Sequence, residues 1–137
     1  MKHNGLGKLY DRLTPEERFR LDVEAMARAA APSVPIVLAP NRDALGTNAM
    51  RLSPPDCLPL AFGHDSFERH LSLAAERQLA VEIRRLPRLA LDIDEPEDLA
   101  LFAAHRKTGH SFEVLVRLGL LERLASIPIP LLDELQP

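Results

Sequence analysis

The sequence predicts an α/β protein with a mainly parallel sheet and flanking helices. One observation is the short, continuous apolar run "IVLAP" at residues 36 to 40, which is bounded by prolines and typical of a strand buried on both faces. A second is that such runs alternate along the chain with stretches of helical apolar spacing. Strands that alternate with helices favour a parallel sheet whose faces are covered by helices.

The first predicted helix covers residues 15 to 30, after a flexible leader at residues 1 to 13. Thr14 is placed to cap this helix, and Glu17 lies three residues on, as a capping box requires. The helical spacing of the apolar residues predicts one buried face. That face holds Phe19, Val23 and Met26.

A strand, a long loop and a second helix are predicted after "IVLAP". The strand is "AMRLS" at residues 49 to 53, and the segment "PPDCLPLAFGHDS" is too rich in proline and glycine for regular structure. Asp65 and Glu68 resemble a second capping box, which would open a helix over residues 66 to 79.

The rest of the chain is predicted to hold two strands and two helices. "AVEIRRL" alternates as a half-buried strand does, and "LALDI" is another buried strand. Pro96 is expected to start a helix over residues 96 to 105. A further amphipathic helix near 111 to 125 belongs to a C-terminal helical extension at 107 to 137. That helix either completes the core or forms a dimerising face, through Val114, Leu115, Leu118, Leu121 and Leu124.

Composition narrows the class of protein. The 137 residues carry 17 Lys and Arg against 20 Asp and Glu, a formal charge of -3, and hold no Trp and one Tyr, so nucleic acid is not expected as a partner. Cys57 is the single cysteine and cannot form an internal disulfide, which favours a reducing cytoplasm. No apolar stretch is long enough for a membrane span.

Two aspartates, Asp92 and Asp94, end the predicted strand "LALDI". On an extended chain their carboxylates share one face, with alpha carbons about 6 to 7 Å apart. Mg²⁺ is commonly held by one or two carboxylates together with water and phosphate oxygens, so the pair is chemically sufficient. The alternative is structural, with Asp94 capping the helix that starts at Pro96 and Asp92 closing the strand.

Two polar turns are candidates for holding an anion. Thr47 in "LGTN" offers a hydroxyl beside a flexible glycine. In "FGHDS", Gly63 permits close approach to the backbone, and Ser66 lies at a helix N-terminus whose free N–H groups and dipole attract anions. Turn chemistry and helix capping would explain both segments equally well.

Other polar residues carry weaker hypotheses. His64 and His70 are each possible acids or bases, but no nucleophile is placed beside them, and His70 is predicted to be a partly buried helix residue. Arg84 and Arg85 are expected on the solvated face or the edge of their strand, with contact to a nucleotide phosphate as the alternative.

Three segments in this order resemble the C-terminal half of the 2-phospho-L-lactate and phosphoenolpyruvate guanylyltransferases of coenzyme F420 biosynthesis. They are "IVLAPNRDALGTNAMRLSPP", "LAFGHDSFERHL" and "LPRLALDIDEPEDL", within residues 34 to 102. The resemblance implies a half-domain at residues 14 to 106, with a fold similar to part of the nucleotide-diphospho-sugar transferases. It also implies transfer of GMP from GTP to the phosphate of phosphoenolpyruvate or 2-phospho-L-lactate.

Carried over residue by residue, the resemblance implies that Thr47, Gly63 and Ser66 contact the phosphorylated three-carbon acid. Asp92 and Asp94 would hold Mg²⁺. No catalytic nucleophile is implied, because the acceptor phosphate itself attacks GTP. The two sets of residues are expected to converge on one phosphate-sized hollow.

Family members begin with a strand and a lysine- and arginine-containing loop that receives GTP, and no such pattern precedes residue 34. A truncated enzyme is therefore expected, in which a complementing chain would receive GTP. Asp11 is a weaker match to a third metal ligand, because the segment that contains it is shorter than in the family.

An alternative interpretation is a non-catalytic α/β binding or dimerisation module derived from the same fold. It would pack its uncovered sheet edge or face against a second copy, giving a homodimer. The sequence leaves open the choice between phosphoenolpyruvate and 2-phospho-L-lactate, the nucleotide base and the oligomeric state.

Overall fold

The computed structural model describes residues 15–28 and 31–129. These divide into two compact units, the first ending at Ala90 and the second beginning at Leu91. The predicted leader and the residues Asp11 and Thr14 lie outside the described residues. None of the helices in the described part of the chain combines the length and the apolarity that crossing a bilayer requires.

The first unit is built on a three-stranded sheet in the order β2–β1–β3. β1 (Ile36–Pro40) lies at the centre, with β2 (Thr47–Leu52) antiparallel on one side and β3 (Val81–Ile83) parallel on the other. The sheet is mixed, so the prediction of a mainly parallel sheet was wrong. Only residues 41 to 46 join β1 to β2, and a parallel crossover needs a dozen residues or more.

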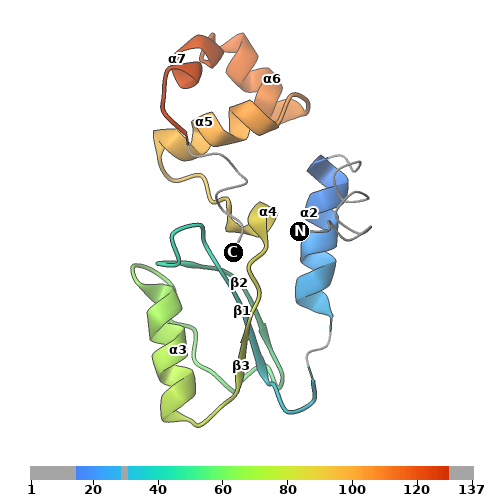
Figure 1. The fold of residues 1–137 in the computed structure, drawn as a ribbon, viewed down its shortest axis with the longest axis vertical. Helices are drawn as coiled ribbons and strands as arrows, with labels where there is room; N and C mark the ends of the chain where they lie inside the picture. The colour runs from blue at the N-terminus through green and yellow to red at the C-terminus, as the bar shows by residue number, and fades with distance from the viewer. Residues whose placement is uncertain (1–14, 29–30, 130–137) are drawn as a thin grey trace, which may run out of the picture. The chain divides into compact units, whose positions relative to one another are not determined.

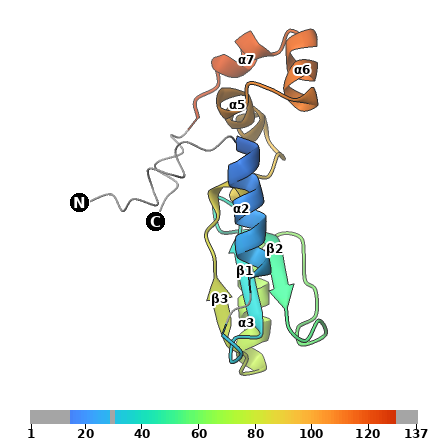
Figure 2. The ribbon, with the colours of Figure 1, turned by 90° about the vertical axis from the view of Figure 1, so that its right-hand side faces the viewer.

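Helices cover both faces of this sheet, which confirms the α/β class. Figure 1 shows α3 (Ser66–Glu76) and α2 (Pro15–Ala27) on opposite sides of the strands, and Figure 2 shows α2 in front of them. Alternate residues of β1 pack against the helices on the two faces of the sheet. Ile36 and Leu38 join a core with Phe67 of α3, and Val37 and Ala39 join another core with Met26 of α2.

The buried face of α2 differs from the predicted one. Met26 and Asp22 are buried, whereas Phe19 and Val23 are exposed. The Asp22 carboxylate accepts a hydrogen bond of 3.0 Å from the backbone N–H of Arg88, at the start of a short helix. A polar residue therefore occupies the packing face because it caps a neighbouring helix.

That neighbouring helix, α4 (Pro87–Ala90), takes the first two residues of the strand predicted from "LALDI". Residues 91 to 94 are irregular, and "AVEIRRL" contributes only β3. Pro87 has a fixed φ suited to the first turn of a helix and no N–H for a sheet ladder. Together with the cap from Asp22, this favours a helical turn over a strand.

α3 begins at Ser66 as predicted, but the predicted capping box was wrong. Asp65 takes a left-handed conformation, with φ of 54°, and its side chain makes no capping hydrogen bond. The helix ends at Glu76, three residues early, and Gln78 is also left-handed, with φ of 55°.

The second unit holds three helices in its described residues: α5 (Pro96–His105), α6 (His110–Arg117) and α7 (Leu121–Ala125). α5 starts at Pro96 as predicted, but its capping box is formed by Glu95 and Asp98, so the prediction that Asp94 caps it was wrong.

The helix predicted near 111 to 125 is two helices. Gly119 has φ of 65°, and its N–H donates to the Val116 carbonyl while the Leu120 N–H donates to that of Leu115. This pair of bonds is a Schellman motif, which ends α6. Leu115 and Leu124 pack in a core with Ala100 and Ala103 of α5, while Val114 and Leu118 are exposed.

Candidate functional site

A β-bulge at the start of β2 determines which face of the sheet the side chains of Thr47 and Asn48 point to. Ala39 of β1 pairs with Ala49, but Pro40 pairs with Thr47, so Asn48 is an extra residue. In an unbroken strand Thr47 would share a face with Ala49, which packs on the α2 side. The bulge reverses the alternation and turns Thr47 to the α3 side.

Hydrogen bonds show both orientations directly. The Thr47 hydroxyl lies 3.0 Å from Nδ1 of His70 in α3. The Asn48 side-chain amide donates to the carbonyl of Leu89 in α4, at 2.8 Å. One residue thus belongs to the α3 face, and its neighbour tethers the helix on the other face.

The structure brings Thr47 and Ser66 together, as a shared site requires. The Thr47 backbone N–H donates to the Ser66 Oγ at 2.9 Å. Thr47 is 7% exposed and Ser66 is 2% exposed, so both residues are buried in the first unit. His70, at 0% exposed, lies behind Thr47.

Gly63 borders this pair from the loop before α3. Its φ of 110° is a conformation that L side chains rarely adopt, and its carbonyl accepts from the Ser66 N–H at 3.1 Å. The Phe67 N–H donates to the carbonyl of Leu45. Two amides at the helix start are therefore bonded internally, so the hydroxyls are the better candidates for an anion than the N–H groups that the sequence predicted to be free.

His70 is buried and uses both ring nitrogens. Nε2 accepts a hydrogen bond of 3.0 Å from the Ala61 backbone N–H, and Nδ1 faces the Thr47 hydroxyl. Burial, and secondarily the positive charge of Arg69, lower the pKa of His70. The exposed ring of Phe62 contacts the imidazole edge-on, with centroids 5.2 Å apart.

Asp92 and Asp94 lie in the irregular segment of the second unit and are both exposed. The extended strand that was expected to align them is absent from this segment. Asp92 Oδ1 accepts from the Ile93 N–H at 3.1 Å. The meeting of these carboxylates with Ser66 stays a prediction, since the two sets belong to different units.

Binding of Mg²⁺ by Asp92 and Asp94 stays a prediction. Across the described residues, no group of three or more His, Cys, Asp or Glu is placed to hold a metal ion. In the same part of the chain, neither Asp92 nor Asp94 forms an ion pair. Two carboxylates of this kind leave room for the water and phosphate oxygens that Mg²⁺ usually retains.

Arg84 is engaged within the first unit, against the expectation of a solvated side chain. Its guanidinium hydrogen-bonds to Glu82 and to the carbonyls of Ala25 and Arg28, at the end of α2. The hydrogen bond from Arg84 lowers the pKa of the Glu82 carboxyl. Arg84 therefore ties β3 to α2, which argues against a role in holding phosphate.

Sequence reasoning missed the roles of His70, Asn48 and Asp22. A signal for His70 existed, because it lies four residues after Ser66 and therefore on the same face of α3. The role of Asn48 depends on the bulge, and that of Asp22 on a helix predicted as a strand, so no local pattern indicated either.

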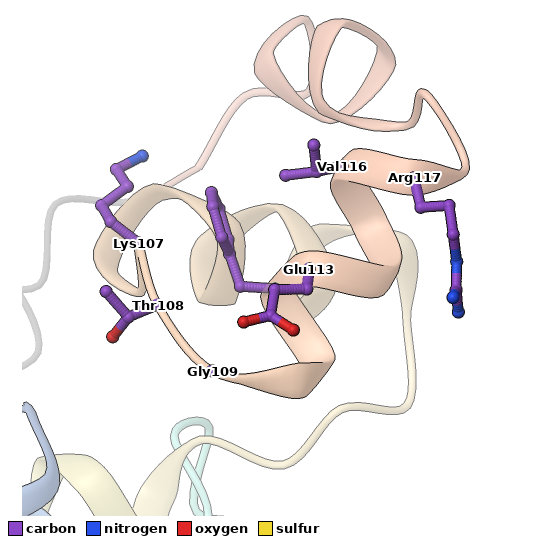
Figure 3. Close-up of a pocket in the computed structure, with 7 residues that line it drawn as sticks. Lys107, Thr108, Gly109, Glu113, Val116 and Arg117 are labelled. Atoms are coloured by element: carbon purple, nitrogen blue, oxygen red, sulfur yellow. The ribbon is translucent and has the colours of Figure 1, made fainter.

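The second unit has a surface hollow of about 350 Å³ beside α6, drawn in Figure 3. It contains none of the predicted site residues. Lys107 donates to the Ala103 carbonyl at 3.0 Å and lies 5.9 Å from the centroid of the Phe112 ring. Lys107 and Arg117 stand on opposite sides of α6 in Figure 3, so their charges do not converge on one ligand position.

With the site described, comparison with known proteins identifies the family. Residues 20–126 match the family described as "Guanylyl transferase CofC like". The chain belongs to this guanylyl transferase family. The family resemblance predicted from the three sequence segments is thereby confirmed.

Several guanylyltransferases are similar to this member of the family. The phosphoenolpyruvate guanylyltransferase of Sphaerobacter thermophilus is 44% identical over 90 residues, covering 66% of this chain and 43% of that protein. That of Rubrobacter xylanophilus is 41% identical over 83 residues, covering 61% and 40%. The 3-phospho-D-glycerate guanylyltransferase of Colwellia psychrerythraea is 39% identical over 94 residues, covering 66% and 44%. The match therefore spans less than half the length of these guanylyltransferases.

Proposed function

We propose that this chain supplies the acid-binding and Mg²⁺-binding side of a guanylyltransferase of coenzyme F420 biosynthesis. The reaction would transfer GMP from GTP to the phosphate of phosphoenolpyruvate or 2-phospho-L-lactate. The observation that carries the proposal is the pairing of Thr47 and Ser66 beside Gly63, in a chain whose residues 20–126 match the family. Relatives named for phosphoenolpyruvate and for 3-phospho-D-glycerate support a phosphorylated three-carbon acid as the substrate class.

In this reaction a phosphate oxygen of the acid attacks the α-phosphorus of GTP. The bond from that phosphorus to the bridging oxygen of the β-phosphate breaks, and pyrophosphate leaves. Because the acid is the nucleophile, the protein has to position it rather than react with it. The hydroxyls of Thr47 and Ser66 would donate to oxygens of the acid, and Gly63 would let the ligand approach the backbone.

Asp92 and Asp94 are proposed to hold Mg²⁺, as exposed carboxylates outside any ion pair of the described residues. When bound, the ion would neutralise negative charge on the phosphates that approach one another. Binding of GTP, and a second chain that completes its pocket, are part of the same proposal.

Calorimetric titration with phosphoenolpyruvate, with and without Mg²⁺, tests the proposal. We expect the wild type to bind in the presence of Mg²⁺, and Ser66→Ala and Asp92→Ala to weaken binding about tenfold or more, since each removes a partner of a charged group. Ser72→Ala, on the exposed side of α3, is the matched control and should bind as the wild type does. Equal affinity of all four proteins would exclude this site.

A further inference from the structure

We propose that His70 is a positioning residue that presents the Thr47 hydroxyl as a hydrogen-bond donor to an anionic oxygen of the bound acid. The inference rests on the proposed function and deepens it, because it assigns the orientation of the ligand-binding hydroxyl to a side chain that never touches the ligand.

The hydrogen bond from Ala61 fixes the tautomer of His70. The Ala61 backbone N–H donates to Nε2 at 3.0 Å, and a backbone amide can only donate. Nε2 therefore carries no hydrogen, and in a neutral imidazole the hydrogen must lie on Nδ1. The His70 side chain is 0% exposed, and burial disfavours a second proton on the ring.

The hydrogen on Nδ1 of His70 points to the Thr47 hydroxyl. Nδ1 lies 3.0 Å from the Thr47 Oγ1, so the imidazole donates and the hydroxyl accepts. A hydroxyl has one hydrogen of its own, and Thr47 does not donate that hydrogen to His70, so it is left for another acceptor. The opposite tautomer would have required that hydrogen, leaving the hydroxyl only able to accept.

The Ser66 hydroxyl is in the same situation as the Thr47 hydroxyl. The Ser66 Oγ accepts the Thr47 backbone N–H at 2.9 Å, so its own hydrogen is likewise left to donate. Two adjacent hydroxyls that both donate match an oxygen-rich acceptor, such as an ionised phosphate or carboxylate, and disfavour a neutral alcohol or amide. The arrangement therefore selects the ionised acid.

A double-mutant cycle tests whether His70 acts through Thr47. Thr47→Val removes the hydroxyl at nearly constant volume, and His70→Gln places an amide near Nε2 but offers no donor at Nδ1. Each change should weaken binding of phosphoenolpyruvate with Mg²⁺ about tenfold, and the pair should weaken it about tenfold as well, because both remove the same donor. Losses that multiply to about a hundredfold would overturn the inference.

His70→Asn provides the rescue, since its amide nitrogen can replace Nδ1. It should bind within about threefold of the wild type, with Thr47 intact, and should give no such recovery in a Thr47→Val background. Thermal unfolding of every variant checks that the protein folds. Equal losses in His70→Asn and His70→Gln would contradict the positioning role.

Ring-nitrogen chemical shifts of ¹⁵N-labelled wild type provide a readout without ligand. We expect the Nδ1–H tautomer at neutral pH, and finding the Nε2–H tautomer would overturn the inference whatever the variants do. Failure of folded wild type to bind phosphoenolpyruvate with Mg²⁺ would instead contradict the proposed function, and with it the assigned ligand. The two failures are therefore distinguishable.

Discussion

At the scale of single residues, His70 couples the fold to protonation. A histidine side chain ordinarily has a pKa of 6.5, and burial, followed by the nearby charge of Arg69, lowers the pKa of His70 in the folded protein. Below pH 6.5, the unfolded chain therefore binds more protons at this site than the folded chain does. The stabilisation from neutral His70 is full above pH 6.5 and is lost as the pH falls from there through the folded pKa.

We expect the free energy of unfolding to decrease between about pH 7 and about pH 5, and part of this decrease to disappear in His70→Gln. Urea unfolding of both proteins across this range measures the difference in slope. Ser72→Ala replaces an exposed side chain of α3 that does not titrate, and as the control it should keep the slope of the wild type. A slope unchanged by His70→Gln would mean that the imidazole is not held neutral by the fold.

At the scale of secondary-structure elements, the cap that α2 provides to α4 is a specific source of stability. Asp22 is 5% exposed, and its burial raises the pKa of the carboxyl against the lowering effect of hydrogen bonds from the Arg88 and Leu89 amides. Asp22→Ala should lower the free energy of unfolding by about 1 to 2 kcal/mol, because it leaves these amides without an acceptor.

The matched variant for this cap is Asp22→Asn, which keeps one acceptor oxygen and removes the buried charge. It should cost less than Asp22→Ala in the same urea measurement. If both variants lower the free energy of unfolding equally, the alanine variant loses packing around α2 and not the cap.

The turn between α6 and α7 depends on the left-handed conformation of Gly119. Gly119→Ala should lower the free energy of unfolding by about 1 kcal/mol, although a new Cβ would meet no atom within 4 Å. Gly119→Asn tolerates the left-handed region better and should cost less. Circular dichroism during thermal unfolding compares the two, and a larger loss in the asparagine variant would contradict the conformational explanation.

Elements that depend on their own residues were predicted correctly from the sequence. Elements whose bounds depend on residues elsewhere in the chain were not. Pro96 starts α5 and "IVLAP" forms β1 as expected, because fixed φ and continuous apolar character act within the element itself. The capping residue of α5 was misjudged by one position, since aspartate is a preferred N-cap residue, whereas the cap here is Glu95 in a reciprocal capping box with Asp98. The break at Gly119 was missed because Leu121 and Leu124 continue the helical apolar spacing.

At the scale of the whole molecule, ligand binding should be sensitive to carboxylates that contribute nothing to folding. Asp92→Asn and Asp94→Asn should leave the melting temperature unchanged, because both side chains are exposed and outside any ion pair of the described residues. Both should remove the rise in melting temperature that Mg²⁺ with phosphoenolpyruvate gives the wild type. Asp56→Asn is the exposed control, and a full rise in all variants would refute the metal site.

The candidate site was predictable in its members but not in its geometry. Thr47, Gly63 and Ser66 were named from turns and a family resemblance, and the structure brings them together in the first unit. The antiparallel direction of β2, in which Thr47 pairs with the last residue of β1, was not predicted. Six connecting residues were the available signal for that, since a chain this short must reverse direction.

Asn48, the extra residue of the bulge in β2, can be expected to tolerate deletion. Asn48 lies between Thr47 and Ala49, so its deletion would leave Pro40 opposite Thr47 and would not rotate the hydroxyl away from His70. The loss would fall on the tie to Leu89 instead. The variant that lacks Asn48 should therefore keep more of its affinity for the acid than the full-length Thr47→Val variant. Here a deletion would be less harmful than a substitution, although deletions are usually the more harmful change.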